Sequence, residues 1–404
     1  MAWSTYQYLF GGHQMKNLLS VCCMGLAVAA LQACAPGETP ESGGSTRKPG
    51  RLVIVGGALQ ADNSAVYDAV VEARAGTGPL CVIPTASGDA PESMNGAIQT
   101  LSEYAGEGEV TGVLITTEDP TRAKDPSVAA ELAACSGFYF TGGSQSRILD
   151  VFLPEGDTTV AYRALWQRWQ DGAVVSGSSA GAAMMSRVMI SGGTSTEAVS
   201  HGVAAGVEEA GVQLRDGMGF FEPLLDQHFL ARGRIGRLLI SVIRDGVPKI
   251  GFGIDENTAL VVDGDAARVV GASGVVVVDG RAAVSSGTHG RAGVTVNLVG
   301  AGDMLDLRTL EIRRHGAKSR VAIHDKSVQL PQDLFSRWAF LHLVAGLAAT
   351  EDTEAVFSFP GVTVTIVEGK GFSASMTDAM GGVEGTPYGL SAGPFEVDLV
   401  GSGS

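Results

Sequence analysis

Ser179 lies in a segment that is typical of a nucleophilic serine. Five small residues, Gly177-Ser178-Ser179-Ala180-Gly181, follow the apolar run 173–175 and precede the apolar run 182–185. A buried strand, a sharp turn and a helix would hold the hydroxyl at a strained apex, the arrangement called a nucleophile elbow. The helix beginning at Ala180 would aim free backbone N–H groups at the same place, which suits a developing oxyanion. An ordinary Gly/Ser turn is the alternative.

A nucleophilic serine needs a base, and His228 is the favoured one of seven histidines. It stands in Asp226-Gln227-His228-Phe229, followed by Arg232, Arg234 and Arg237. The other six lie in the leader, in expected loops, in a short strand or in an apolar run. A solvated helix face would also explain the arginines, but Gly233 and Gly236 argue against a plain surface helix.

The acid that would orient the base lies in residues 251–259, at the end of an expected strand. Two carboxylates are adjacent there, Asp255 and Glu256. Neighbours on a strand point to opposite faces, so only one of them can face His228, and the residues alone do not choose. The order serine, histidine, acid differs from that of α/β-hydrolases, chymotrypsin and subtilisin. A conventional esterase or lipase is therefore disfavoured.

Four segments together resemble the cyanophycinase family, serine peptidases related to acidic dipeptidases. They are residues 140–145, 177–182, 226–238 and 253–259, in the family's order across about residues 51–307. The resemblance implies Ser179 as nucleophile, His228 as general base and Glu256, rather than Asp255, as orienting acid. Gly143 and Ala180 would supply the oxyanion N–H groups. The substrate pocket would be lined by Gln145, Asp226, Gln227, Arg232, Arg234 and Arg237.

The resemblance also implies a substrate, cyanophycin, which is a poly-aspartate backbone with arginine on each side-chain carboxyl. The family releases β-Asp-Arg dipeptides from it. Arginines can grip carboxylates in bidentate fashion, while Asp226 and Gln145 could bind a guanidinium. The family usually has Asp where this chain has Ser144, which leaves fine specificity open. Alternatives are a peptidase of small acidic or isoaspartyl peptides and a non-catalytic surface binding protein.

The composition narrows the partners. The net charge of −15, from 43 acidic and 28 basic residues, argues against a nucleic-acid partner. No Cys/His spacing resembles a metal site, and we expect no metal and no cofactor. The pair Gly56-Gly57 follows the first expected strand but lacks G-x-G-x-x-G, so a dinucleotide site is disfavoured. The oligomeric state is left open, a homodimer included.

The first residues predict export. Lys16 precedes an apolar stretch, residues 18–31, that ends in Leu31-Gln32-Ala33-Cys34. This is typical of a bacterial lipoprotein signal over residues 1–33, cleaved before a lipid-bearing Cys34, with Met15 as a candidate start. An uncleaved anchor or a plain secretory signal is the alternative. Residues 34–50 are then expected to be a flexible tether, and the protein to be anchored by lipid to the cell envelope.

The remaining body predicts an α/β fold. Expected strands at 52–55, 80–83, 110–115, 137–140 and 173–176 alternate with expected helices at 63–74, 94–103, 127–134 and 160–170. This alternation favours a mostly parallel sheet covered on both faces. The resemblance implies a three-layer α/β/α sandwich similar to class I glutamine amidotransferases, over residues 51–310. Cys81 and Cys135 are expected to be buried free thiols rather than a pair.

Beyond about residue 259 the pattern changes to short valine-rich strands and glycine turns. Residues 311–404 are predicted to be a C-terminal, β-rich extension of unknown role. An apolar helix is expected at 334–349 and strands at 357–367, and the glycine-rich residues up to Ser404 are expected to be loosely ordered.

Overall fold

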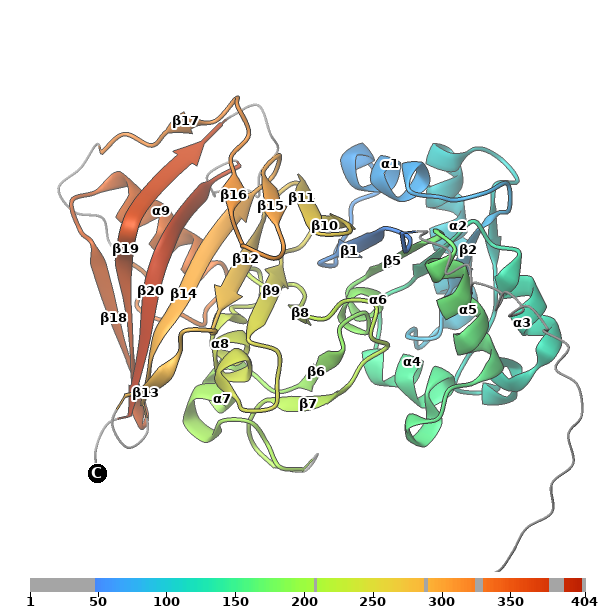
Figure 1. Cartoon of the computed structure of the whole chain (residues 1–404), viewed down its shortest axis with the longest axis horizontal. Helices are drawn as coiled ribbons and strands as arrows, with labels where there is room; N and C mark the ends of the chain where they lie inside the picture. The colour runs from blue at the N-terminus through green and yellow to red at the C-terminus, as the bar shows by residue number, and fades with distance from the viewer. Residues whose placement is uncertain (1–47, 207–208, 287–289, 324–329, 378–388, 402–404) are drawn as a thin grey trace, which may run out of the picture. The chain divides into compact units, whose positions relative to one another are not determined.

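Two large sheets carry the fold (Figure 1). The computed structural model describes residues 48–206, 209–286, 290–323, 330–377 and 389–401. The expected signal, Cys34 and all but the last residues of the expected tether lie outside this part of the chain. Within it, no helix is both long and apolar enough to cross a membrane.

The first sheet is built on five parallel strands. They are β1 (Leu52–Val55), β2 (Leu80–Ile83), β3 (Val110–Gly112), β4 (Gly137–Phe140) and β5 (Val174–Ser178), in the order β3-β2-β4-β5-β1. Antiparallel strands continue the sheet beyond β1: β10 (Thr258–Asp263), β11 (Ala266–Gly271), β15 (Met304–Asp306) and β16 (Ile312–Arg313). The five expected strands are thus found, with β3 shorter than expected.

Helices cover both faces of this sheet. The connections are α1 (Ser64–Glu72), α2 (Ala90–Ala105), α3 (Pro126–Ala133), α4 (Gln145–Phe152) and α5 (Val160–Gln170), with the short helices η1 (Pro120–Lys124) and η2 (Pro154–Gly156). Alternate residues of β1 enter different cores: Val53 packs in one cluster with α1 and α2, and Ile54 in another with α3, α4 and α5. Since strand neighbours face opposite ways, this confirms the expected α/β/α layers.

The second sheet joins strands from both sides of residue 310, the expected start of the extension. Its order is β17 (Ser319–Arg320), β19 (Val362–Met376), β20 (Ser391–Gly401), β14 (Gly290–Gly300), β12 (Gly274–Asp279), β9 (Ile250–Ile254) and β8 (Leu224–Asp226). At its sides β13 (Val284–Ser286) pairs with β14, and β18 (Glu354–Phe359) pairs with β19. Helices α8 (Ile235–Ile243) and α9 (Ala339–Ala349) share one hydrophobic core with this sheet. The remaining elements are α6 (Ala180–Ala183), α7 (Ser195–His201) and the pair β6 (Val188–Gly192) and β7 (Gln213–Asp216).

The expected extension beyond residue 310 packs in the same compact unit as the residues before it. Residues 47–404 cluster as one compact unit. Strand β20, from beyond that boundary, pairs with β14 on one side and β19 on the other. The expectation of a loosely ordered end is therefore wrong for residues 391–401, where Phe395, Val397 and Leu399 are buried. Residues 378–388 and 402–404 lie outside the described residues.

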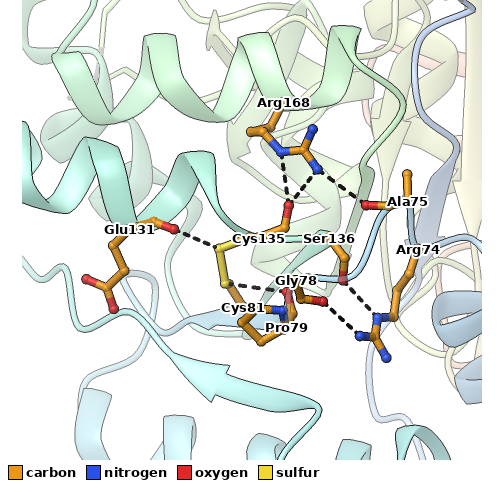
Figure 2. The surroundings of a disulfide bond; sticks show 9 residues. All are labelled: Arg74, Ala75, Gly78, Pro79, Cys81, Glu131, Cys135, Ser136 and Arg168. Atoms are coloured by element: carbon orange, nitrogen blue, oxygen red, sulfur yellow. Dashed lines mark hydrogen bonds between the residues drawn. A yellow bond between two sulfur atoms is a disulfide. The ribbon is translucent and has the colours of Figure 1, made fainter.

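The two body cysteines form a disulfide, so the expectation of free thiols is wrong. Cys81 lies in β2 and Cys135 just before β4, with their Cα atoms 5.9 Å apart. The Ser136 N–H donates to Pro79 O (2.8 Å), which brings Cys135 beside β2. Figure 2 shows two arginines at the bond: Arg168 Nε donates to Cys135 O (3.0 Å) and Arg74 Nη2 to Gly78 O (2.9 Å). The pairing of β2 with β4 brings the two cysteines together, and this pairing cannot be recognised from the sequence alone.

Candidate active site

Ser179 lies between β5 and α6 in a strained backbone conformation, with φ 56° and ψ −110°. Only a few per cent of non-glycine residues have a positive φ, and they gather at functional sites. The Ser179 N–H donates to Val55 O (3.0 Å). A Cβ on Gly177 would lie 2.5 Å from Gly181 O, and one on Gly181 would lie 2.3 Å from Phe140 O. The turn therefore requires these glycines, as the predicted elbow does.

His228 is held against Ser179 by the loop that follows β8. Its ring nitrogen Nε2 lies 2.8 Å from Ser179 Oγ. Its backbone also has a positive φ, 48°, and its N–H donates to Gly56 O (2.6 Å). A Cβ on Gly57 would lie 2.3 Å from His228 Nε2. Gly57 therefore gives the ring its space, a role that the sequence analysis missed although the paired glycines after the first strand were its signal.

Glu256 is the carboxylate that faces His228. Its Oε1 lies 2.7 Å from His228 Nδ1, and about a quarter of the side chain is exposed. Asp255 points away and is fully buried, where it accepts hydrogen bonds from Ala231 N (2.9 Å) and Ser273 Oγ (2.8 Å). Burial raises the pKa of Asp255, and these hydrogen bonds act in the opposite direction. Asp255 thus fastens the loop that carries His228, while Glu256 contacts the ring.

The environment lowers the pKa of His228. Burial of the ring is the largest cause, and the charges of Arg232 and Arg234 act in the same direction, whereas the Glu256 hydrogen bond and charge oppose them. A neutral imidazole with Nδ1–H donating to Glu256 leaves Nε2 free to accept the Ser179 proton. The arrangement can therefore work as a nucleophile, a base and an orienting acid.

The residues predicted for the oxyanion site flank Ser179. A Cβ on Gly142 would lie 3.5 Å from Ser179 Cβ, so the Gly142-Gly143 loop passes beside the serine. Gly143 has a φ of 143° and is packed against Ala86 O, which excludes any side chain there. Ala180 begins α6, so its N–H belongs to the first turn, which has no acceptor within the helix. Their role in binding an oxyanion stays a prediction.

Two residues predicted to contact substrate, Asp226 and Arg237, are buried and bind each other. Asp226 and Arg237 are 1% and 5% exposed. Arg237 Nε donates to Asp226 Oδ2 (2.7 Å), Arg237 Nη2 also bonds the carboxylate, and Arg234 Nη1 lies 3.5 Å from Asp226 Oδ1. Arg237 Nη1 further donates to Gly193 O (2.8 Å). Asp226 and Arg237 are therefore structural, because a charge buried this deeply needs a partner of its own.

The other predicted contacts differ in how open they are. Arg232 has a side chain 53% exposed, with Nε 4.0 Å from Glu256 Oε1, so its guanidinium can reach both the triad and solvent. Arg234 is mostly buried, donates to Gln227 O (2.6 Å) and bonds the Gln227 side chain. Burial lowers the pKa of Arg234 to about 10. Gln145, the first residue of α4, donates to Ile190 O (3.0 Å). Arg232 is thus the best placed of these residues to meet a substrate carboxylate.

A segment beyond residue 310 reaches this loop, which the sequence analysis did not foresee. The Trp338 N–H donates to Leu230 O (2.7 Å). A Cβ on Gly233 would lie 1.9 Å from Phe335 O, and one on Gly236 would lie 2.8 Å from the Phe335 ring. Only packing in three dimensions brings these segments together, so no local pattern would have found the contact. Searched over the described residues alone, the chain shows no cluster of His, Cys, Asp or Glu that could hold a metal.

The α/β sheet with a serine at an elbow, hydrogen-bonded to a histidine that a carboxylate orients, defines a serine hydrolase. Residues 52–270, more than half of the chain, match Peptidase family S51. The chain belongs to this family, and it is a serine-type peptidase.

Curated relatives agree with this family. The chain is 32% identical over 243 residues to the cyanophycinase of Synechococcus elongatus, covering 57% of this chain and 70% of the relative. It is 32% identical over 233 residues to the cyanophycinase of Nostoc sp., covering 56% and 73%. Among solved structures, a peptidase from an acI-B1 Actinobacterium is 20% identical, covering 64% of this chain and 98% of that chain, with a TM-score of 0.45.

Proposed function

We propose that this peptidase hydrolyses cyanophycin and releases β-Asp-Arg dipeptides, with Ser179, His228 and Glu256 as its catalytic triad. The observation that carries the mechanism is the hydrogen-bonded chain from Ser179 Oγ through His228 to Glu256 Oε1. The similarity to relatives named cyanophycinase supports the substrate.

In this mechanism Ser179 Oγ attacks the backbone carbonyl of an aspartyl residue while His228 Nε2 accepts its proton. The Gly143 and Ala180 N–H groups stabilise the oxyanion, and Glu256 stabilises the imidazolium. Collapse of the intermediate breaks the C–N bond, and His228 returns the proton to the leaving amine. A water, deprotonated by His228, then hydrolyses the acyl-enzyme ester. Arg232 binds a carboxylate of the substrate beside the triad.

A second candidate is a peptidase of small acidic or isoaspartyl peptides. Two observations favour it. The Asp226 carboxylate is buried with Arg237 and is not open to a substrate guanidinium, and Ser144 stands where the resemblance leads us to expect a carboxylate. The open cation Arg232 would serve either substrate.

The test is to incubate the protein and its Ser179→Ala variant with insoluble cyanophycin and to identify soluble products by mass. We expect β-Asp-Arg from the wild type and a loss of roughly 10⁴-fold or more in the variant. Equal release by both proteins would reject Ser179. No release from cyanophycin together with serine-dependent cleavage of isoaspartyl dipeptides would select the second candidate.

The place of action is also part of the proposal: export and lipid anchoring through Cys34. The Cys81–Cys135 disulfide supports it, since such bonds persist mainly in oxidising compartments. In a bacterial host, the protein should fractionate with membranes and carry a lipid at a new N-terminal Cys34. A Cys34→Ser variant that stays equally membrane-bound would contradict the anchor.

A further inference from the structure

A pocket of about 500 Å³ lies on the second sheet, and no triad residue lines it. Its lining comes from three neighbouring strands and one crossing segment: Asn297 of β14, Gly371 and Ser373 of β19, Gly393 and Pro394 of β20, and Leu310, Ile312 and Arg314. Pockets that bind small molecules have volumes of about 300–1,000 Å³. This pocket is therefore large enough for a ligand of amino-acid or dipeptide size.

An irregularity in the sheet shapes the pocket. The register between β19 and β20 shifts between Glu368 and Ser373, and Gly371 has a φ of 81°. A bulge of this kind bends a strand away from its neighbour and recurs next to functional sites. A Cβ on Gly393 would lie 2.4 Å from Asn297 Oδ1, so a side chain there would displace the carboxamide.

Arg314 brings a charge into the pocket that forms no ion pair with any residue the structure describes. Its guanidinium is half-buried, and throughout the described ranges its one hydrogen bond is to Ser373 O, with no carboxylate at ion-pair distance. Burial lowers the pKa of Arg314, and the charge of Asp303 acts in the opposite direction. The nearest candidate, Asp303, is fully buried and bound to Lys318 Nζ (2.7 Å) and to the His315 N–H (2.8 Å). A guanidinium has five N–H donors, so most of those of Arg314 have no partner among the described residues.

The carboxamide of Asn297 is a second hydrogen-bonding group in the pocket. Its side chain makes no hydrogen bond to any residue that the structure describes, and it is only partly buried. The lining residues that the structure describes include no Asp or Glu. In a chain with 43 acidic and 28 basic residues, a pocket with one cation and no carboxylate selects against cationic ligands. An arginine fork beside a free amide matches the acceptor pattern of a carboxylate.

We propose that this pocket is a second ligand site, which binds the free carboxylate of an amino-acid-sized or peptide ligand through Arg314 and Asn297. Arg314 forms the ion pair, Asn297 donates from its amide, and Leu310, Ile312 and Pro394 cover the apolar part of the ligand. The carboxylate comes either from a small acidic molecule or from a polymeric substrate. The site does not depend on the catalytic roles proposed above.

The experiment is calorimetric titration of the full-length Ser179→Ala protein with N-acetyl-L-aspartate. Adding Arg314→Gln is expected to weaken the binding at least about tenfold, because a charge-assisted pair is lost. Adding Asn297→Asp keeps the size of the side chain but places a negative charge in the pocket. We expect it to weaken the binding of N-acetyl-L-aspartate as well. The matched control is Arg313→Gln. Arg313 is the exposed neighbour of Arg314 and has the same charge, but it bonds Met304 outside the pocket, so its replacement should leave binding unchanged.

A second arm separates the two sources by sedimenting the same proteins with cyanophycin granules. If Arg314→Gln abolishes retention of the protein on the granules and Arg313→Gln does not, the site binds the polymer. If Arg314→Gln leaves this retention unchanged but weakens the binding of N-acetyl-L-aspartate, the site binds a small ligand. Arg314→Lys, which keeps the charge but not the fork, should bind with intermediate affinity and excludes a folding artefact. Equal binding by the Ser179→Ala parent and by its Arg314→Gln and Asn297→Asp derivatives in both arms would overturn the proposal.

Discussion

His228 combines a positive φ with a ring that touches both Ser179 and Glu256. Its position depends on neighbours without reactive groups: Gly57 leaves room for the ring, and Asp255 holds the Ala231 N–H of the same loop. The triad is therefore fixed by its backbone surroundings, and its protonation by burial and the nearby arginines.

The pH dependence follows from the lowered pKa of His228. As the proposed base, His228 can accept a proton only when neutral, so kcat/KM should fall as the pH drops through this pKa, with the acid limb below the ordinary value of 6.5. Arg232→Gln removes one cause of the lowering and should move the limb to higher pH. Arg244→Gln, an exposed arginine that does not act on His228, should leave it in place. A limb that moves equally in both variants would contradict the assignment.

At the residue scale, the sequence predicted which residues form the proposed triad, but it did not predict which of the surrounding charged residues bind each other. The motif around Ser179 and the isolated His228 were recognisable locally, and the resemblance chose Glu256. The burial of Asp226 with Arg237 was not recognisable, because an acid and an arginine 11 residues apart can equally face a substrate. Only the packing of β8 against α8 decides between the two.

Among the elements, the loop 228–234, between β8 and α8, connects the proposed base His228 to the segment before α9. Asp255 fastens it through Ala231, Ser195 Oγ donates to Gly233 O (2.7 Å), and the Trp338 N–H donates to Leu230 O. Arg232, placed between these contacts, therefore has its backbone held on several sides. Residues outside the matched range 52–270 thus help to position a candidate substrate contact.

Gly233 and Gly246 test this positioning as a matched pair. Both have positive φ, 58° and 78°, but an added Cβ at Gly233 meets Phe335 O at 1.9 Å whereas one at Gly246 meets nothing within 4 Å. Each alanine variant should lose about 1–2 kcal/mol of unfolding free energy from backbone strain. Gly233→Ala should lose more and should also raise KM, because the Arg232 turn moves. Equal stability and equal KM would show that Phe335 does not constrain the loop.

The sequence predicted helices and strands correctly where a continuous hydrophobic run marks the element. It failed where a glycine-rich composition hid the pattern of a strand. Strands β1, β2 and β4 and helix α5 have the bounds that their sequence patterns predict. Strand β20 was missed because its glycines resembled a loose tail, although Phe395, Val397 and Leu399 alternate as a half-buried strand does. The disulfide was missed because only the pairing of β2 with β4 brings Cys135 to Cys81.

Across the whole molecule, the C-terminal strands share one sheet with the strands that lead into the proposed triad, and they also carry a buried charge cluster. Lys318 and Asp303 have fully buried side chains 2.7 Å apart, and Ser391 of β20 bonds both. The sheet that contains β20 also contains β8 and β9, which lead into His228 and Glu256. Losing this cluster should therefore affect the catalytic site as well as the C-terminal strands.

Lys318→Met tests this coupling. Removing one partner of a buried pair leaves Asp303 uncompensated and should cost about 3–5 kcal/mol. Urea unfolding followed by circular dichroism and by residual peptidase activity should shift together. Lys249→Met is the control, because Lys249 pairs with the fully exposed Asp245 and donates to Arg244 O (2.8 Å) at the surface, so its loss should cost much less than that of Lys318. Activity that survives an early unfolding of the C-terminal strands would show that the two regions are independent.

The most direct test of the central claim is the rate and position of covalent labelling by a serine-directed fluorophosphonate. The protein and its His228→Ala variant are treated, digested and mapped by mass. The account predicts one adduct, on Ser179, forming at least about 100-fold more slowly without His228. An adduct on another serine, or labelling of Ser179 at the same rate in both proteins, would contradict it.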